Sequence, residues 1–170
     1  TLEAPVTGGA HNAESATITI LVGGDEDIYR KHTAAFAAMG GRVFYLGELG
    51  KAAIIKVITN MLAFIHIAAT AEAYMLAAKG GIDLRLAWEV IKASSGNSFI
   101  HETESTTILS GSYDIGFSLD LSCKDLGFAT QLGREFDVPL PIASIVEQLN
   151  QHARNEFGGS AGSPMVAKLI

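Results

Sequence analysis

One long apolar segment constrains the fold of this chain more than any other feature. It runs from Lys51 to Lys79, where Gly80-Gly81 follows, and its apolar run is interrupted by Lys56, Thr59, Asn60, His66 and Glu72. A membrane span needs about 20 mostly apolar residues, and these interruptions favour a buried helix of a soluble protein. A helix that is apolar nearly all round normally lies in the middle of a bundle or at a subunit interface. We therefore expect an all-helical domain built on one central helix, and a homo-oligomer.

Short β-type runs precede the long segment, at residues 2–7, 17–22 and 42–46. Residues 25–39 repeat apolar side chains at roughly helical spacing, with acidic residues at the start and two glycines after the end. The polar stretch 10–16 is expected to be irregular. These elements predict one βαβ unit with an extra strand ahead of it, which is too small to be a complete doubly wound sheet.

The remainder of the chain predicts further helices joined by short linkers. The expected helices cover residues 84–94 behind the N-cap Asp83, a weaker one at 100–109, then 121–136, 141–155, and a short terminal piece opened by Ser163-Pro164. The predicted fold class is α+β but mostly α. We expect two domains: residues 1–50, a remnant of a Rossmann-type sheet, and residues 51–170, an all-helical bundle.

Composition narrows the classes of partner. The chain has 12 Lys plus Arg against 18 Asp plus Glu and a net charge of −6, which argues against nucleic acid and against an anionic membrane as partners. The only cysteine, Cys123, excludes an intrachain disulfide and fits a reducing, cytoplasmic setting. The five histidines lack metal-site spacing, so no metal is expected. A start without Met and without a signal-peptide pattern suggests a fragment.

Lys56 and Asn60 are the first candidate functional residues. They are four residues apart, so in a helix their side chains share one face roughly 6 Å apart. An amine and an amide could then converge on one ligand, although a lysine that reaches solvent through its stem is an equally good explanation. Acid–base work by a lysine requires burial to lower its pKa from ~10.4 towards neutrality.

Two further motifs each allow a functional and an ordinary explanation. Thr7-Gly8-Gly9 follows a short strand, and glycines there let backbone N–H groups approach a carboxylate or phosphate, but a plain turn has the same sequence. Lys124-Asp125 is predicted to open a helix, where a solvated ion pair is the ordinary explanation. No strand is followed by G-x-G-x-x-G, so the chain lacks the dinucleotide fingerprint.

Five motifs occur together in one order along the whole chain. They are LEAPVTGG at residues 2–9, TITILVGG at 17–24, GELG at 47–50 followed by Lys56 and Asn60, and the stretches 72–80 and 117–125. In this order they resemble the motifs of the β-hydroxyacid dehydrogenases, which include 3-hydroxyisobutyrate dehydrogenase and tartronate semialdehyde reductase. The first motif is similar to the family's D-A-P-V-S-G-G, and the third to its catalytic K-x-x-x-N.

The resemblance implies a fold and an activity. The family joins an amino-terminal Rossmann domain through a long helix to an all-helical domain, as in 6-phosphogluconate dehydrogenase, and oxidises small hydroxyacids with NAD or NADP. It implies that Lys56 is the catalytic lysine and that Asn60 orients the substrate. It also implies that Thr7, Gly8 and Gly9 bind the substrate carboxylate, and that Lys124 and Phe117 lie at the nicotinamide end of the cofactor.

The chain departs from the family pattern at several positions. Glu3, Thr7 and Thr59 stand where the family usually has aspartate, serine and asparagine, and Asn12, Ala16 and Ala52 replace glycines. The amino-terminal nucleotide-binding half is missing. We therefore expect the carboxy-terminal portion of such a dehydrogenase, inactive without its Rossmann half. The alternative is a non-catalytic helical dimerisation module.

Overall fold

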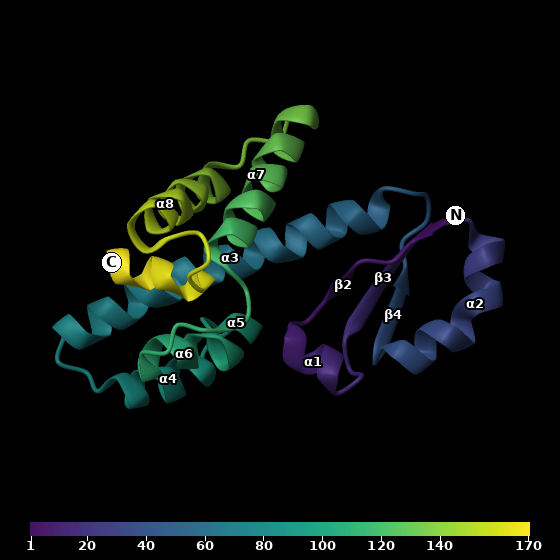
Figure 1. The fold of residues 1–170 in the computed structure, drawn as a ribbon. Coiled ribbons are helices and arrows are strands. Elements are labelled where there is room, and N and C mark those ends of the chain that lie inside the picture. Colours follow the sequence, from purple (N-terminus) through teal and green to yellow (C-terminus); the bar gives the residue numbers. More distant parts are fainter. The chain divides into compact units, whose positions relative to one another are not determined.

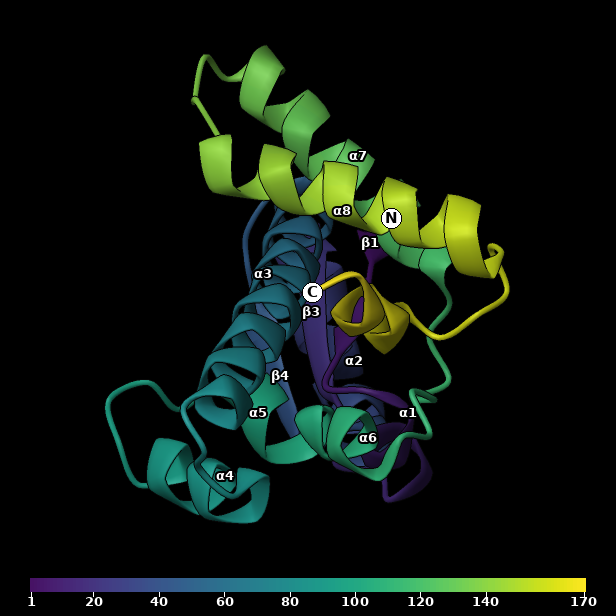
Figure 2. The same cartoon turned by 90° about the vertical axis from the view of Figure 1, so that its left-hand side faces the viewer.

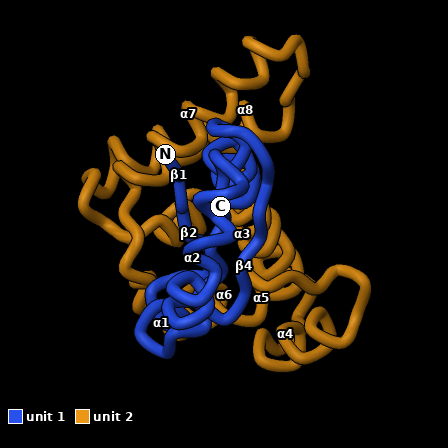
Figure 3. Tube along the Cα trace, turned by 90° about the vertical axis from the view of Figure 1, so that its right-hand side faces the viewer, with its two compact units in different colours: residues 1–59 blue, residues 60–170 orange.

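The computed structural model describes all residues from Thr1 to Ile170. It contains a small four-stranded sheet and eight α-helices, one of them much longer than the rest (Figure 1), so the predicted class, α+β and mostly α, is confirmed. The chain forms two compact units, residues Thr1–Thr59 and Asn60–Ile170, coloured separately in Figure 3. The boundary falls within the long helix, and each unit is described by itself below.

The sheet of the first unit is centred on β3 (Thr19–Gly24). On one side β3 pairs in parallel with β4 (Arg42–Tyr45), and on the other it pairs antiparallel with β1 (Leu2–Glu3) and then β2 (Val6–Thr7). Pro5 lies between these two short strands, and its carbonyl accepts a hydrogen bond from Leu21 N. β1 and β2 therefore act as one kinked edge strand.

Two helices complete the sheet unit. α2 (Glu26–Met39) connects β3 to β4, which confirms the βαβ unit, and the Asp25 carboxylate caps it by accepting from Ile28 N. α1 (Ala10–Glu14) was not foreseen: the stretch expected to be irregular is a five-residue helix that ends at Ser15. Ile20, Val22 and Phe36 form the core of the unit.

The long helix α3 spans Lys51–Lys79, as expected from the sequence. By length and composition it is the only helix able to cross a membrane, and 22% of its most apolar window is buried within this chain. The sequence predicted a buried helix, but much of α3 is exposed within this chain. Leu62, Met75 and Leu76 remain exposed, the last by 76%.

Six shorter helices join most of α3 in the second unit. They are α4 (Leu84–Lys92), α5 (Phe99–Thr103), α6 (Ser105–Ser110), α7 (Leu119–Glu135), α8 (Pro141–Phe157) and the 3-10 helix η1 (Ser163–Leu169). Asp83 caps α4 as predicted. The single weak helix expected at 100–109 is two short helices. α7 and α8 lie side by side, joined by a short loop (Figure 2).

The core of the second unit joins α3, α7 and α8. Phe64, Leu119, Leu126, Val146 and Ala153 are among its buried members. A buried polar network lies nearer the end of α3. His101 Nε2 faces the Trp88 carbonyl at 3.0 Å, His101 Nδ1 faces the Tyr74 hydroxyl at 3.2 Å, and that hydroxyl is 2.7 Å from Ser105 Oγ. Burial raises the pKa of the Tyr74 hydroxyl.

Candidate functional site

The Thr7–Gly9 segment forms a sharp turn directly after β2. Gly8 has a φ of 123° and Gly9 a φ of 83°, conformations that favour glycine over any residue with a Cβ. Asn12 Nδ2 donates a 2.8 Å hydrogen bond to the Gly8 carbonyl, and Thr17 N donates to the Asn12 carbonyl at 2.8 Å. Asn12, which stands where the family has glycine, therefore holds the turn against the start of β3.

The start of α3 is held by a residue far away in sequence. One carboxylate oxygen of Glu3, Oε1, accepts from Gly50 N at 2.8 Å, from Ala52 N at 2.9 Å and from Ala53 N at 3.4 Å. The carboxylate thus pairs with the amide just before α3 and with two amides of its first turn, which no helix carbonyl can satisfy. Lys56 follows one turn later and is half-buried.

In the second unit the structure brings two predicted site residues to one carboxylate. Asn60 Nδ2, on α3, donates to Asp125 Oδ2 at 2.7 Å, and Lys124 Nζ lies 3.3 Å from Asp125 Oδ1, both on α7. The Asp125 side chain is 15% exposed and that of Lys124 is 52% exposed. Asp125 therefore joins the amide of Asn60 to the ammonium of Lys124.

Two expectations about this part of the chain need correction. Lys124-Asp125 does not open a helix, because α7 begins at Leu119 with Ser118 as its N-cap. The pair is also not merely solvated, because Asp125 is largely buried and bonded to Asn60. Phe117 precedes α7, and its ring centroid lies 5.6 Å from that of Phe64 on α3. This contact packs Phe117 against the helical core, and its role towards a cofactor stays a prediction.

Three residues of these arrangements escaped the sequence reasoning. Glu3 and Asn12 were noticed only as departures from a family pattern, and Asp125 only as the neighbour of Lys124. No spacing rule links Glu3 to Gly50 or Asn60 to Asp125, since the paired residues are 47 and 65 positions apart. For Glu3, the only sequence feature that pointed to a function was its place at a position where the family pattern has aspartate.

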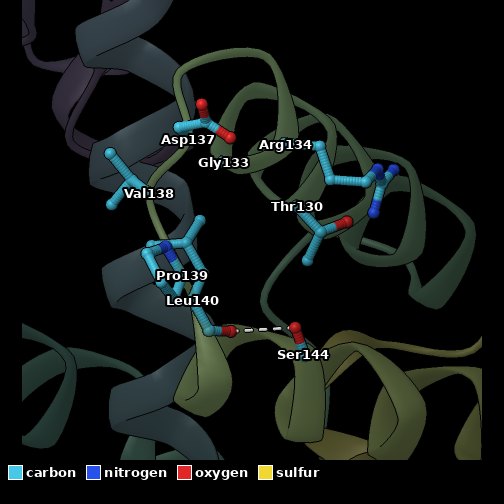
Figure 4. A pocket seen from close by; sticks show the side chains of 8 residues that line it. All are labelled: Thr130, Gly133, Arg134, Asp137, Val138, Pro139, Leu140 and Ser144. Carbon is cyan, nitrogen blue, oxygen red and sulfur yellow. Dashed lines mark hydrogen bonds between the residues drawn. The ribbon is translucent and has the colours of Figure 1, made fainter.

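Two pockets lie elsewhere in the second unit. One, of about 290 Å³, surrounds the turn from α7 to α8, where Arg134, Asp137 and Pro139 are among its lining residues (Figure 4). The other, of about 280 Å³, lies between α3 and the loop after α4 and is lined by His66, Thr70 and Asn97 among others. None of the predicted site residues lines either pocket, and no group of three or more potential metal-ligating side chains is present.

Comparison with protein-family models identifies both parts of the chain. Residues 50–170 match the model described as NAD-binding of NADP-dependent 3-hydroxyisobutyrate dehydrogenase, and residues 1–47 match that of the NAD binding domain of 6-phosphogluconate dehydrogenase. The class is therefore that of the two-domain nicotinamide-dependent dehydrogenases. At the level of the family, this confirms the expectation of NAD or NADP as cofactor.

Individual relatives narrow the class. The chain is 35% identical to 2-(hydroxymethyl)glutarate dehydrogenase of Eubacterium barkeri, over 90% of this chain and 51% of that protein. It is 34% identical to L-threonate dehydrogenase of Pectobacterium atrosepticum, over 99% of this chain and 56% of that protein. The chain thus spans about half the length of these relatives.

A solved structure shows the same fold. The structure of 3-hydroxyisobutyrate dehydrogenase from Salmonella typhimurium matches 99% of this chain with a TM-score of 0.91 and 31% identity, and 60% of that chain is covered. The structure of 3-hydroxyisobutyrate dehydrogenase from Mycobacterium tuberculosis with L-serine matches with a TM-score of 0.87 and 28% identity. The chain belongs to the β-hydroxyacid dehydrogenase family, of which it represents a carboxy-terminal portion.

Proposed function

We propose that this chain is the substrate-binding and helical portion of an NAD(P)-dependent β-hydroxyacid dehydrogenase, active once a nucleotide-binding half is supplied. The observation that carries the proposal is the placement of Lys56 and Asn60 one turn apart on α3, with Asn60 held by Asp125 and Asp125 paired with Lys124. The amine of Lys56 can exchange a proton with a substrate hydroxyl. The amide of Asn60 can form a hydrogen bond to the substrate, and the ammonium of Lys124 can attract an anionic group.

In the proposed reaction Lys56 is the general acid and base. In the direction of oxidation its Nζ accepts the proton of the substrate hydroxyl, and in reduction it returns that proton to the carbonyl oxygen. A bound nicotinamide would supply the hydride chemistry at the carbon that carries this hydroxyl. Asn60 orients the same oxygen by hydrogen bonding, and its amide is kept in one rotamer by the 2.7 Å bond to Asp125.

The Thr7–Gly9 turn is proposed to bind the substrate carboxylate. Its two glycines leave the backbone N–H groups open to close approach, and the Thr7 hydroxyl supplies one more donor. The Thr7 methyl narrows the space relative to the serine of the family pattern, which favours small hydroxyacids. The names of the relatives, which include threonate, 3-hydroxyisobutyrate and 2-(hydroxymethyl)glutarate, support a small hydroxyacid as the substrate class.

The residues of this chain fit the nicotinamide end of a cofactor only. Lys124 offers a half-exposed ammonium that Asp125 orients, and Phe117 precedes the same helix. Both are proposed to lie beside the nicotinamide. The pyrophosphate and ribose need the G-x-G-x-x-G turn, which this chain lacks and a nucleotide-binding half would supply.

We further propose a homo-oligomer that works in the cytoplasm. The exposed apolar side chains of α3 and α4, among them Leu62, Leu76, Leu86 and Val90, require cover from another surface. A second copy of this chain provides such cover, and no membrane or nucleic acid is needed. Light scattering at micromolar concentration tests this proposal, and a monomer would contradict it.

The activity is tested on two proteins: the chain itself, and the chain fused behind the amino-terminal half of an L-threonate dehydrogenase. Each is assayed for NAD- and NADP-dependent oxidation of a panel of small β-hydroxyacids, with Lys56→Ala as the variant. We expect activity only in the fusion, reduced at least ~10²-fold by Lys56→Ala because a general acid/base is lost. A fusion that binds NADH but oxidises nothing would favour the non-catalytic dimerisation module.

A further inference from the structure

We propose that Glu3 is a positioning residue, which fixes the first turn of α3, and with it Lys56, against the strand segment that carries the Thr7–Gly9 turn. The inference rests on the proposed role of Lys56, but its main test does not depend on activity. It gives a function to a residue that the family resemblance marks only as a departure.

One carboxylate oxygen of Glu3 holds three backbone amides. Oε1 of Glu3 accepts hydrogen bonds from Gly50, Ala52 and Ala53, at 2.8, 2.9 and 3.4 Å. Hydrogen bonds from backbone N–H groups to an ionised carboxylate are stronger than those between neutral groups. A negative charge at a helix N-terminus is also stabilised by the helix dipole. Because these partners are 47 to 50 residues apart in sequence, the bonds connect two separate segments.

Glu3 and the Thr7–Gly9 turn belong to one short segment that is hydrogen-bonded to β3. The backbone of Glu3 pairs with Gly23 on β3, and Thr7 pairs with Thr19 on the same strand. Between them, the Pro5 carbonyl accepts from Leu21 N. Only three residues, in a segment bonded to the central strand, therefore separate the residue whose carboxylate holds α3 from the turn proposed to bind substrate.

Lys56 lies on α3 one turn beyond the amides that Glu3 holds. It lies four residues after Ala52, whose amide Glu3 holds and whose side chain is fully buried. Residues four apart lie on the same face of a helix, about 6 Å apart along its axis. Because a helix transmits a displacement of its first turn to the next, a shift at Ala52 moves Lys56 relative to the Thr7–Gly9 turn.

Gly23 provides the space that this arrangement needs. A Cβ at Gly23 would lie 2.5 Å from Glu3 Oε1 and 3.0 Å from the Glu48 carbonyl. Its φ is ordinary, so the glycine is required for space rather than for backbone conformation. Gly23→Ala therefore displaces the Glu3 carboxylate without removing its charge, which gives a second way to test the proposal.

The main test measures the start of α3 by NMR in the chain as it stands. Glu3→Gln, Glu3→Asp and Gly23→Ala are compared with Glu14→Gln, which removes an exposed carboxylate on α1. We expect the Ala52 amide to exchange with solvent about tenfold faster in Glu3→Gln and Gly23→Ala. Backbone ¹⁵N relaxation should show increased mobility that extends to Lys56. Glu3→Asp should give a smaller change, and Glu14→Gln none.

Two results would overturn the proposal. If exchange at Ala52 is unchanged in Glu3→Gln, the carboxylate does not hold the helix. If mobility increases at Ala52 and Ala53 but not at Lys56, Glu3 is a helix cap without a positioning role. Should Glu3→Gln not fold, Glu3→Asp and Gly23→Ala answer the same question with the charge retained.

The fusion protein separates this proposal from the proposed function. Glu3→Gln should lower kcat about tenfold and leave the KM for the nicotinamide cofactor within about twofold, because the cofactor contacts are not moved. Full activity of Lys56→Ala would refute the proposed function and leave the NMR result standing. Unchanged kcat in Glu3→Gln, with Lys56→Ala inactive, would refute the positioning role alone.

Discussion

The two compact units hold their candidate functional residues by different means. In the first unit the candidate substrate turn is an arrangement of backbone, set by the positive φ of Gly8 and Gly9 and held by Asn12. In the second unit the arrangement consists of side chains, with Asp125 between Asn60 and Lys124. Substitutions in the Thr7–Gly9 turn should therefore act through backbone strain, and substitutions around Asp125 through lost hydrogen bonds or charge.

The interiors of the two units differ in their polar content. The sheet unit buries a small apolar core of Ile20, Val22 and Phe36. The helical unit buries polar groups as well, including the His101 network and a hydrogen bond from Ser122 Oγ to Asn150 Oδ1. Buried polar groups specify one arrangement when all are bonded and are costly when one partner is lost.

The largest effect on stability is expected from His101→Ala. The side chain is 1% exposed, and its loss leaves a cavity and removes partners from the Tyr74 hydroxyl and the Trp88 carbonyl. We expect the free energy of unfolding to fall by about 3 kcal/mol, measured by urea denaturation. His152→Ala, at an exposed position, is the control and should change it by less than about 0.5 kcal/mol. Similar losses in both variants would contradict the importance of the network.

Glu104→Gln tests how the stability of the second unit depends on pH. Burial raises the pKa of this carboxyl to about 7 in the folded chain, above its value in the unfolded chain. Because the folded chain binds this proton more tightly than the unfolded chain, the contribution of Glu104 to the unfolding free energy is largest below about pH 4.5. It is lost as the pH rises to about 7. In the unsubstituted chain this titration should lower the unfolding free energy by about 3 kcal/mol between pH 4.5 and 8. Glu104→Gln should abolish that decrease and give a flatter curve of unfolding free energy against pH. An unchanged curve would show that Glu104 titrates normally.

Gly8→Ala tests the backbone argument in the first unit. Its φ of 123° is rarely adopted by L residues, and a Cβ there would lie 3.0 Å from Asn12 Nδ2. We expect a loss of about 2 kcal/mol in unfolding free energy and, in the fusion enzyme, an increase in substrate KM. Gly96→Ala, at a glycine with ordinary φ, is the control. Chemical shifts of the second unit should not change, and broad changes there would mean that the units are coupled.

Most of the fold could be predicted from the sequence because its signals are local. The apolar run ended by Gly80-Gly81 gave the bounds of α3, and Asp25 and Asp83 marked the starts of α2 and α4. The helix Ala10–Glu14 was missed because it buries no side chain and so has no apolar periodicity. The exposure of α3 was underestimated because the spacing of apolar residues does not show which surface packs against them.

The candidate site was predictable only in part. Lys56 and Asn60 are four residues apart, so helical geometry alone places them on one face. Glu3 and Asp125 act on residues 47 or more positions away, and only the fold brings those residues together. Sequence patterns identify residues whose partners are local, whereas the residues that position them are found by hydrogen bonds between distant segments.

Asp125→Asn should have the smallest effect, and it separates the two contacts of this side chain. An asparagine still offers an oxygen to Asn60 Nδ2, but it removes the negative charge beside Lys124. We expect kcat/KM of the fusion enzyme to fall about tenfold, or ~1.4 kcal/mol, and Asp125→Ala, which also removes the bond to Asn60, to cost more.

The matched control for this prediction is Asp120→Asn, on the same helix. Asp120 forms an exposed ion pair with Arg154, and exposed pairs contribute little, so activity should be unchanged. A double-mutant cycle with Lys124→Met then measures whether Lys124 and Asp125 act together. If Asp125→Asn is as active as Asp120→Asn, the ion pair with Lys124 has no functional role. If Asp125→Ala alone is impaired, Asp125 acts on the substrate side through Asn60.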